Sequence, residues 1–444
     1  MRPKLLAASL AFLVLINACK KDDSPTLKPP SNLIYKTDTA IVLKGRSDTS
    51  VTPVVDWNGR KGAFSFASTV RQGITIDATT GKITWTADLP IGTYILPVVA
   101  NNIGVGSDTT IYTLMVSGMI TTIAGGAQGF SGDGGPALNA QLWMPFDVTT
   151  DAANNIYLVD SYNNRVRKIS PDGTITTFAG DGDAIFFGDG GPASAASFSR
   201  PSGITLDAQN NMYITDYGNS RIRKINAAGI VSTVAGKDYT TVGFLGDEGP
   251  ATSAQLYLLA GKVALDAEGS IYIPDYGNQR IRKVTPDGII HTIAGNGTMG
   301  APPIPDGTPG PSGAIGGPSG ICYDPAKGSL FIVSNLESSI FRLTSGSLYT
   351  VAGYSAGLYR PSNIVKDPQG NLYIADFGNN MIQRISPDGT ISIIAGNGKS
   401  GFSGDGGPAA AASLNLPYGL AIDANGDLII ADSYNNRIRK VTLH

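Results

Sequence analysis

A repeat of about 55 residues determines what the C-terminal three quarters of this chain can form. Apolar runs end in an Ala-Gly pair at Gly125, Gly180, Gly236, Gly295, Gly353 and Gly396. Between these glycines a second apolar run ends in an aspartate, at Asp160, Asp216, Asp275, Asp376 and Asp432. Self-similarity at a fixed period indicates one supersecondary unit stacked on copies of itself, because a single unit cannot bury its own apolar face.

Each repeat holds four strand-like segments in the same order. In the second repeat they are residues 201–207, 212–216, 221–225 and 230–235. Short apolar or alternating runs separated by Asn, Gly and Asp turns are typical of antiparallel strands, and four of them make one propeller blade. The first strands begin at Pro145, Pro201, Ala260, Pro318, Pro361 and Pro417, which predicts an all-β fold with six blades.

Three motifs make a family resemblance specific. They are NLYIAD at 371–376, NNRIRK at 435–440 and FSGDGGPA at 402–409, and together they resemble NHL repeats. The resemblance covers residues 119–444 and implies a six-bladed propeller of NHL type over residues 118–444. Residues 119–124 form a strand without a blade, while residues 417–443 supply three strands, so we expect these two segments to pair. Such a 3+1 closure removes the free sheet edges.

The first nineteen residues have the pattern of a secretory signal. A charged start precedes the apolar run Leu5–Ile16, which is too short to span a membrane. Ile16-Asn17-Ala18-Cys19 resembles a lipobox, which implies acylation of Cys19; the alternative is an ordinary cleaved signal. Lys20–Asp23 resembles the charged tag of some surface lipoproteins. We therefore expect an exported protein, lipid-anchored in the outer membrane and exposed at the cell surface.

A linker and a small domain separate this signal from the repeats. Residues 20–31 are rich in charge, Pro and Ser, which is typical of a flexible tether. Residues 32–117 change to short alternating runs that predict a β-sandwich. The stretch 74–85, with a hairpin turn at 77–81, resembles bacterial immunoglobulin-like or cadherin-like modules. That resemblance implies a spacer, since a fold alone carries no chemistry.

Charge and cysteine content exclude some functions. The formal net charge is −2, and no Lys/Arg cluster follows the signal segment, so we expect no nucleic-acid partner. After removal of the signal segment Cys322 is the one cysteine besides Cys19, so no disulfide forms within the folded chain. Cys322 lies in an apolar inner strand, which favours a buried inert thiol over a nucleophile.

The repeated charged residues have a structural and a functional interpretation. A rim of carboxylates invites the hypothesis of metal or sugar binding. Asp, Asn and Gly also supply the tight turns that a repeated blade needs, and a single site would need its residues only once. We therefore interpret the repeated aspartates as turn residues. The repeated arginines, such as Arg167 and Arg223, are interpreted as partners in ion pairs between blades or as solvent-exposed groups.

Positions that break the repeat carry the site hypothesis. Alignment of the inner strands gives Asp147, Lys262 and Asn363 in three blades, where the other three have glycine. The preceding position gives Phe146 and Tyr418 in the first and last blades. These five residues predict a polar pocket at the mouth of the channel, suited to a glycan or a peptide end. The alternative is that Asp147 and Lys262 merely compensate each other's charge.

Enzymes occur among propellers that resemble this one. Related six-bladed propellers include lactonases and a zinc-dependent lyase, which hold a metal on the axis. Here His291 falls in an outer strand and His444 is the last residue, which argues against a His-ligated zinc. A calcium held by Asp147 and Asn363 would support a calcium-dependent hydrolase or lyase. The leading hypothesis is a non-enzymatic surface scaffold, monomeric or in an assembly, that presents its rim to a polysaccharide or a protein.

Overall fold

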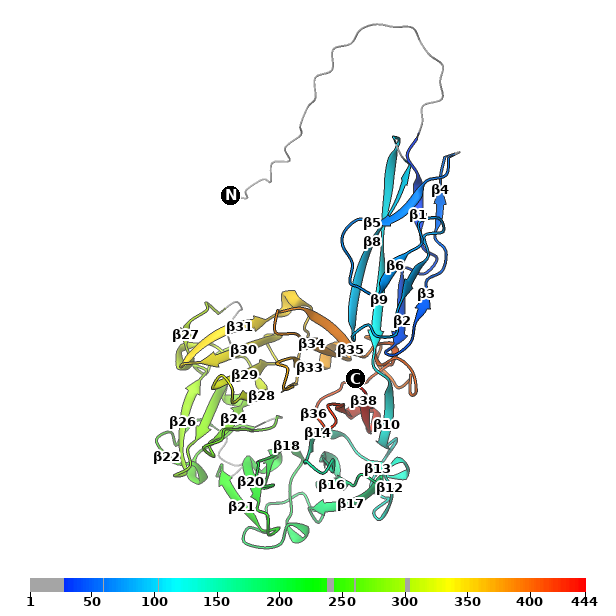
Figure 1. Cartoon of the computed structure of the whole chain (residues 1–444). Helices are drawn as coiled ribbons and strands as arrows, with labels where there is room; N and C mark the ends of the chain where they lie inside the picture. The colour runs from blue at the N-terminus through cyan, green and yellow to red at the C-terminus, as the bar shows by residue number, and fades with distance from the viewer. Residues whose placement is uncertain (1–27, 59, 103, 238–242, 259–260, 300–303) are drawn as a thin grey trace, which may run out of the picture.

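The computed structural model describes residues 28–58, 60–102, 104–237, 243–258, 261–299 and 304–444 (Figure 1). The predicted signal segment, Cys19 and most of the predicted tether lie outside these residues. The fold is all-β with short 3₁₀ turns. Among the described residues, the helical segments are all too short to cross a bilayer.

The predicted N-terminal sandwich consists of three small sheets around one apolar core. The strands are β1 (Ser31–Ile34), β2 (Thr39–Leu43), β3 (Asp48–Thr49), β4 (Val54–Asp56), β5 (Ala63–Phe66), β6 (Ile74–Ile76), β7 (Ile83–Trp85), β8 (Gly92–Asn102) and β9 (Gly106–Ser117). The sheets have the orders β2-β9-β8-β5, β3-β7-β6 and β1-β4. Leu33, Trp85 and Leu114 meet in the shared core. Ser31, assigned to the tether from sequence, begins β1 because it pairs with Asp56.

Within the described residues, the rest of the chain forms six sheets of four or five antiparallel strands, arranged as blades around an axis (Figure 1). Blade one has β14 (Pro145–Thr150), β15 (Ile156–Asp160), β16 (Arg165–Ile169), β17 (Thr174–Ala179) and β12 (Gly135–Pro136); blade two has β18 (Pro201–Leu206), β19 (Met212–Asp216), β20 (Arg221–Ile225) and β21 (Val231–Ala235); blade three has β23 (Ala264–Leu265), β24 (Ile271–Asp275), β25 (Arg280–Val284), β26 (Ile289–Ala294) and β22 (Gly249–Pro250).

The second half of the ring continues this order. Blade four has β28 (Pro318–Asp324), β29 (Ser329–Ser334), β30 (Ser339–Thr344), β31 (Ser347–Ala352) and β27 (Thr308–Pro309); blade five has β32 (Asn363–Lys366), β33 (Leu372–Asp376), β34 (Met381–Ile385) and β35 (Ile391–Ala395); blade six has β36 (Leu420–Ile422), β37 (Leu428–Asp432), β38 (Arg437–Val441) and β10 (Ile120–Gly125). A small parallel pair, β11 (Ala127–Gln128) and β13 (Gln141–Leu142), precedes blade one.

Short 3₁₀ turns link the strands at two recurring places. Among the described residues, five follow the second strand of a blade: η2 (Ser161–Asn163), η4 (Tyr217–Asn219), η7 (Tyr276–Asn278), η10 (Phe377–Asn379) and η12 (Ser433–Asn435). The others lie in the connections between blades: η1 (Ala137–Asn139), η3 (Ala193–Ala195), η6 (Ala251–Ser253), η8 (Gly310–Ser312), η9 (Tyr354–Ala356) and η11 (Ala409–Ala411). The turns that follow second strands position the candidate site.

The core of the propeller is a series of interfaces between neighbouring blades. Every residue of β19, β24, β33 and β37 is buried, because a second strand has a blade packed on each face. At one such interface Val159 of blade one meets Ile204 and Ile214 of blade two. Fully buried strands explain why their sequences are continuous apolar runs instead of alternating ones.

The predicted closure of the ring is confirmed. β10 pairs antiparallel with β38, from Ile120 opposite Val441 to Gly125 opposite Arg437. The sandwich sits against blades five and six beside this seam (Figure 1). There the Arg384 guanidinium donates to the Ile91 carbonyl oxygen at 3.2 Å. The Ala410 N–H donates to the Ser117 hydroxyl at 3.0 Å. Sandwich and propeller therefore share one buried and one partly buried polar contact as well as an apolar boundary.

Candidate ligand site at one mouth of the propeller

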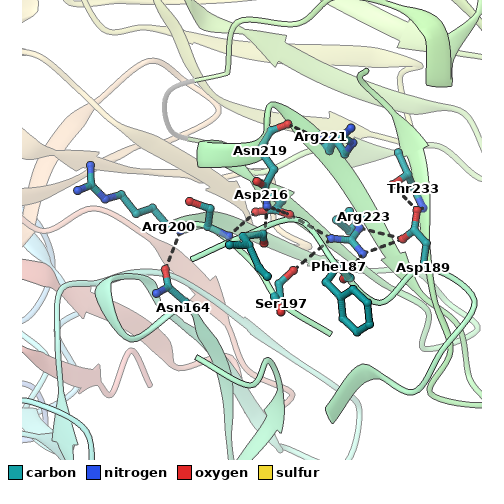
Figure 2. Close-up of polar contacts among 12 residues, drawn as sticks. Asn164, Phe187, Asp189, Ser197, Arg200, Asp216, Asn219, Arg221, Arg223 and Thr233 are labelled. Carbon is teal, nitrogen blue, oxygen red and sulfur yellow. Dashed lines mark hydrogen bonds and ion pairs between the residues drawn. The ribbon is translucent and has the colours of Figure 1, made fainter. Parts of the chain in front are cut away.

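The repeated aspartate of each regular blade lies at the centre of a buried network, shown for blade two in Figure 2. Asp216 accepts hydrogen bonds from the Ser199 N–H at 2.8 Å and from the Asn219 amide at 2.9 Å. Arg223, whose side chain has no exposed surface, lies 3.2 Å from Asp216 and 2.7 Å from Asp189. The network therefore fastens the turn and the preceding connection to the third strand of the same blade.

The same arrangement recurs in blades one, three and six. The arginines Arg167, Arg282 and Arg439 each bridge the repeated aspartate and a second aspartate, respectively Asp160 and Asp133, Asp275 and Asp247, and Asp432 and Asp405. The interpretation of the aspartates as structural agrees with these contacts. The expected ion pairs between blades are wrong for these arginines, because both carboxylates belong to the arginine's own blade or to the connection entering it.

Burial sets the proton affinity of these carboxylates. Desolvation raises the pKa of Asp160 and of Asp216 to about 6, although backbone, Asn and Arg donors act in the opposite direction. Burial also raises the pKa of Asp275, Asp376 and Asp432. Since their oxygens accept bonds from the protein itself, these carboxylates are engaged in holding the blades and do not face a ligand.

The predicted polar residues Asp147, Lys262 and Asn363 meet near the axis. The Asn363 amide donates to Asp147 at 3.1 Å, and the Ile204 N–H donates to the other carboxylate oxygen at 3.0 Å. Lys262 donates to the Leu420 carbonyl oxygen at 2.8 Å. Desolvation raises the pKa of Asp147 to about 6 despite the opposing charge of Lys262. Asp147 and Asn363 thus form a buried pair, and the charge of the half-buried Lys262 partly compensates the aspartate.

Close approach of the inner strands explains why Asp147 and Asn363 are buried. A Cβ on Gly203 would lie 2.2 Å from the Gly261 carbonyl oxygen, and one on Gly419 would lie 2.4 Å from the Asp147 Cα. Only glycine permits such contacts. The prediction that Asp147 and Asn363 line a pocket is therefore wrong: both have no exposed surface and close the axis below the mouth. Lys262 lines a depression at the opposite end.

The axial residues do not fit the calcium ion that the sequence left open. Calcium takes six to eight oxygen ligands. Both Asp147 oxygens already accept N–H donors, and the Asn363 amide oxygen accepts the Ile364 N–H at 2.7 Å. In the part of the chain that the structure describes, no three His, Cys, Asp or Glu side chains are grouped to hold a metal.

The other residues considered for chemistry lie away from the mouth. His291 is on the outer strand β26 and contacts Glu248, and His444 contacts Asp427, so neither lies at the axis. Cys322 is partly buried on β28, and desolvation raises the pKa of its thiol. A raised pKa disfavours the thiolate, which is the nucleophilic form, in agreement with an inert role.

An aromatic pocket of about 310 Å³ occupies the mouth above the closed axis. Phe146 and Tyr418, both predicted from sequence, line it and contact each other edge to face at 5.0 Å between ring centroids. Phe377 contacts Tyr418 at 5.8 Å. The complete described lining is Phe146, Ser161, Tyr162, Arg200, Ser202, Tyr217, Tyr276, Asn335, Arg360, Phe377 and Tyr418. Two of the five predicted ligand-binding residues therefore belong to the pocket.

Five of the eleven described lining residues come from one recurring position that sequence reasoning missed. It is the residue directly after the end of the second strand, which is Ser161, Tyr217, Tyr276, Asn335 and Phe377 in blades one to five. The aspartate or serine before this position fixes the start of the turn, so the side chain at this position lies at the mouth. Alignment of the blades at this position would have revealed it, because the residue varies between Tyr, Phe, Ser and Asn while the residue before it is repeated.

Two arginines enter the pocket from a second recurring position. Arg200 and Arg360 immediately precede the proline before an inner strand and have φ values of 44° and 49°. Left-handed backbone is unfavourable for residues other than glycine and persists where the surroundings impose it. Here the preceding blade imposes it: the Arg200 N–H donates to the Asn164 amide oxygen at 2.9 Å and the Arg360 N–H to the Ser338 hydroxyl at 3.0 Å.

Comparisons with known proteins agree with this architecture. The model of the teneurin NHL domain matches residues 181–244, and that of the NHL repeat matches residues 414–441. The protein SUPPRESSOR OF QUENCHING 1, chloroplastic, of Arabidopsis thaliana is 28% identical over 340 residues, which are 70% of this chain and 32% of that protein. The chain thus spans about a third of the length of this curated relative.

Solved structures resemble the whole chain. A structural genomics protein of unknown function from Bacteroides thetaiotaomicron has a TM-score of 0.54 at 19% identity, covering 94% of this chain and 98% of that one. An auxiliary nutrient binding protein from Bacteroides ovatus has a TM-score of 0.54 at 14% identity, covering 92% and 96%. At such identities the likeness concerns the fold alone. The chain therefore carries NHL repeats that are folded as a β-propeller.

Proposed function

We propose that this protein is a binding protein that takes a glycan at the aromatic mouth of its propeller. The observation that carries the proposal is the pocket itself, in which positions that differ between blades converge above a closed axis. Tyr217, Tyr276 and Phe377 supply apolar ring faces, and Asn335 and Ser161 supply hydrogen-bonding groups. A sugar has the matching chemistry, because its ring presents a C–H face and its hydroxyls donate and accept hydrogen bonds.

A buried hydroxyl without a partner supports a ligand in this pocket. Ser202 is 2% exposed and lines the pocket, and its Oγ has no hydrogen-bond partner among the described residues. Native proteins rarely leave a buried polar atom unpaired, because the desolvation cost is not recovered. A ligand hydroxyl at the base of the pocket would supply the missing partner.

Exposed aromatic rings extend this surface around the mouth. Trp143 and Tyr162 of blade one contact each other at 5.4 Å with 31° between their planes. Tyr359 lies so close over Gly378 that an added Cβ would be 2.4 Å from its ring. Glycine at this place lets the tyrosine lie flat on the backbone and present its other face to solvent. Flat exposed rings are the groups on which further sugar units would stack.

The composition of the pocket favours binding over catalysis. Glycoside hydrolysis uses a pair of carboxylates, and general acid–base catalysis uses His, Asp, Glu, Lys, Tyr or Cys with matched pKa values. The described lining holds no carboxylate, histidine or cysteine. Desolvation raises the pKa of Tyr418, which keeps this phenol neutral. The auxiliary nutrient binding protein of similar fold is consistent with a binding role.

The test is a glycan-panel screen followed by calorimetry on the bound glycans. We expect Tyr217→Ala and Tyr276→Ala each to weaken binding about tenfold, since each removes one stacking face. Tyr349→Ala, on the outer strand β31 of blade four, serves as the matched control and leaves affinity unchanged. Absence of binding across the panel, or equal affinity of all three variants and the parent, contradicts the proposal.

We also propose that the propeller is displayed at the cell surface through a lipid on Cys19. The support is the sequence: the apolar run Leu5–Ile16, the lipobox-like residues that end at Cys19 and the charged segment Lys20–Asp23. The expected result is that Cys19→Ala moves the protein from the membrane fraction to the soluble fraction, and that protease added to intact cells degrades the parent. Membrane association that survives the substitution contradicts the lipid anchor.

A further inference from the structure

Two guanidinium groups enter the aromatic pocket from opposite sides. Arg200 precedes blade two and Arg360 precedes blade five, three blades apart in a ring of six described blades. Both side chains are exposed. Figure 2 shows the Arg200 side chain extending away from the Asp216–Arg223 network. Its guanidinium carbon instead lies 5.3 Å from the centroid of the Tyr162 ring.

Neither guanidinium has a carboxylate partner among the described residues. By contrast Arg223, which pairs with Asp189 and Asp216, is fully buried and holds its blade together. The nearby aspartates Asp216 and Asp376 are turned into their own networks, where Asn219 and Gln383 bind them. The mouth therefore presents two cations within an aromatic surface, and its described lining supplies no compensating anion.

The fold does not require arginine at these places. The equivalent residues of blades six and one are Leu416 and Met144, with φ values of 49° and 53°. Their backbone N–H groups are held by the preceding blade in the same way as that of Arg200: the Leu416 N–H donates to Asn380 and the Met144 N–H to Asn436. The left-handed backbone is thus a property of the ring, whereas the guanidinium groups are specific to two sides of the pocket.

We infer that the glycan bound at this mouth is acidic and that its anionic oxygens lie between Arg200 and Arg360. This inference rests on the proposed glycan-binding function. A guanidinium presents a planar fork of N–H donors that matches the two oxygens of a uronate carboxylate or of a sulfate ester. In a pocket walled by aromatic rings water screens charge less than at an open surface, so each charge-assisted bond is stronger there.

The experiment compares matched acidic and neutral glycans. Trigalacturonate is measured against its methyl ester, and a chondroitin sulfate oligosaccharide against its desulfated form, after a panel with uronate-bearing, sulfated and neutral members. We expect the protein to bind acidic members of the panel. Masking of the anion is expected to weaken that binding at least about tenfold. The uronate and sulfate pairs show which anion is recognised. The affinity is also expected to fall as salt concentration rises.

The chain itself supplies conservative variants. Arg200→Met and Arg360→Leu install residue types that the same position already has in blades one and six, so folding is preserved. Each is expected to lower affinity for the acidic glycan at least about tenfold and to lower affinity for its neutral form by clearly less. Arg46→Gln, an exposed arginine of the sandwich, removes the same charge elsewhere and is expected to have no effect.

The outcomes separate the two proposals. Binding of neutral glycans only, or equal affinity for the masked and free forms, overturns the acidic ligand and leaves the glycan-binding function standing. An acidic glycan whose affinity is unaffected by Arg200→Met and Arg360→Leu overturns the assigned position of the anion. Absence of any glycan binding overturns both proposals together.

Discussion

Blades one, two, three and six contain a buried arginine between two carboxylates, whereas blades four and five are built without it. In blade five Gln383 donates to Asp376 at 2.6 Å in the place of the arginine. In blade four the fully buried Phe341 occupies that place, and Ser334 replaces the aspartate. All six described blades nevertheless keep the same antiparallel strand order. Apolar packing between blades therefore forms the ring, and the charged network is a local addition to it.

The connections between blades show what the network adds. In blade two the connection carries Asp189, which binds Arg223 and also accepts the Thr233 N–H at 3.1 Å. Blade four retains half of this arrangement, since Asp306 accepts the Thr350 N–H at 2.8 Å without an arginine. Blade five has only a short connection with the turn η9. The arginine is thus found on blades that a long connection enters, whereas blade four holds its long connection through Asp306 without one.

The largest expected effect comes from placing methionine at the same strand position in blades two and five. Arg223→Met leaves Asp216 buried without its cation and is expected to lower the free energy of unfolding by about 3–5 kcal/mol. Gln383→Met removes a neutral donor and is expected to cost about 1–2 kcal/mol, because Asp376 retains the Tyr359 N–H and the Asn379 amide. Urea denaturation of both variants measures the difference, and equal losses would remove the distinction between the two kinds of blade.

The axis offers a second contrast, because blade one has Asp147 where blade two has Gly203. Burial raises the pKa of Asp147 to about 6 from 3.8. A folded pKa above the unfolded one means that the native state binds the proton more tightly. Protonation of Asp147 therefore adds to the free energy of unfolding: this stabilisation is complete below pH 3.8 and is lost as the pH rises through about 6. The loss at neutral pH corresponds to about 3 kcal/mol.

Asp147→Asn removes that titration. We expect the variant to become more stable relative to the parent as the pH rises from about 3 to about 7, by up to about 3 kcal/mol. Free energies of unfolding measured in urea across this range test the expectation. Parallel pH profiles for the two proteins would show that Asp147 does not titrate between these values.

A further test introduces into blade two the residues that blade four has in place of the ion pair. The double variant Asp216→Ser and Arg223→Phe replaces an ion pair with the serine and phenylalanine that blade four has at Ser334 and Phe341. Replacement of a buried ion pair by apolar residues is often close to neutral, so we expect the double variant to recover at least about 2 kcal/mol of the loss caused by Arg223→Met. A double variant as unstable as the single one would show that the blades are not interchangeable.

The smallest effect concerns the connections. Asp189→Ala removes a carboxylate that binds both Arg223 and the outer strand, and we expect a loss of about 1–2 kcal/mol, limited because the side chain is partly exposed. Asp306→Ala removes only the bond to the Thr350 N–H and is expected to cost about 0.5–1 kcal/mol. Thermal unfolding of the pair checks the order, and the reverse order would contradict the fastening role.

The architecture could be predicted from the sequence, but only part of the candidate site could. The number of blades, the closing strand pair and the structural use of the repeated aspartates follow from the repeat, because each depends on local strand and turn chemistry. The second carboxylate partner of each arginine was missed because the two lie far apart in sequence, as Asp189 and Arg223 do, and only the folded blade brings them together.

The error at the axis has a different physical origin. The alignment of inner strands singled out Asp147 and Asn363 correctly as unusual residues, yet whether they face a pocket depends on how closely the strands approach. That distance is set by glycines of neighbouring blades, such as Gly419 against Asp147. The pocket residues Tyr217 and Tyr276 were overlooked because their turn follows a repeated motif, and convergence at the mouth is a property of the ring and not of one repeat.

The pairing of β10 with β38 also has a consequence for biosynthesis. The sandwich strand β9 leads through Gly118 directly into β10, so β10 is the first part of the propeller to leave the ribosome. Its partner β38 is almost the last. A chain that stops anywhere before Arg437 leaves the edge of β10 unpaired, however well the intervening blades have formed. The seam thereby makes a finished ring conditional on translation to the final strand.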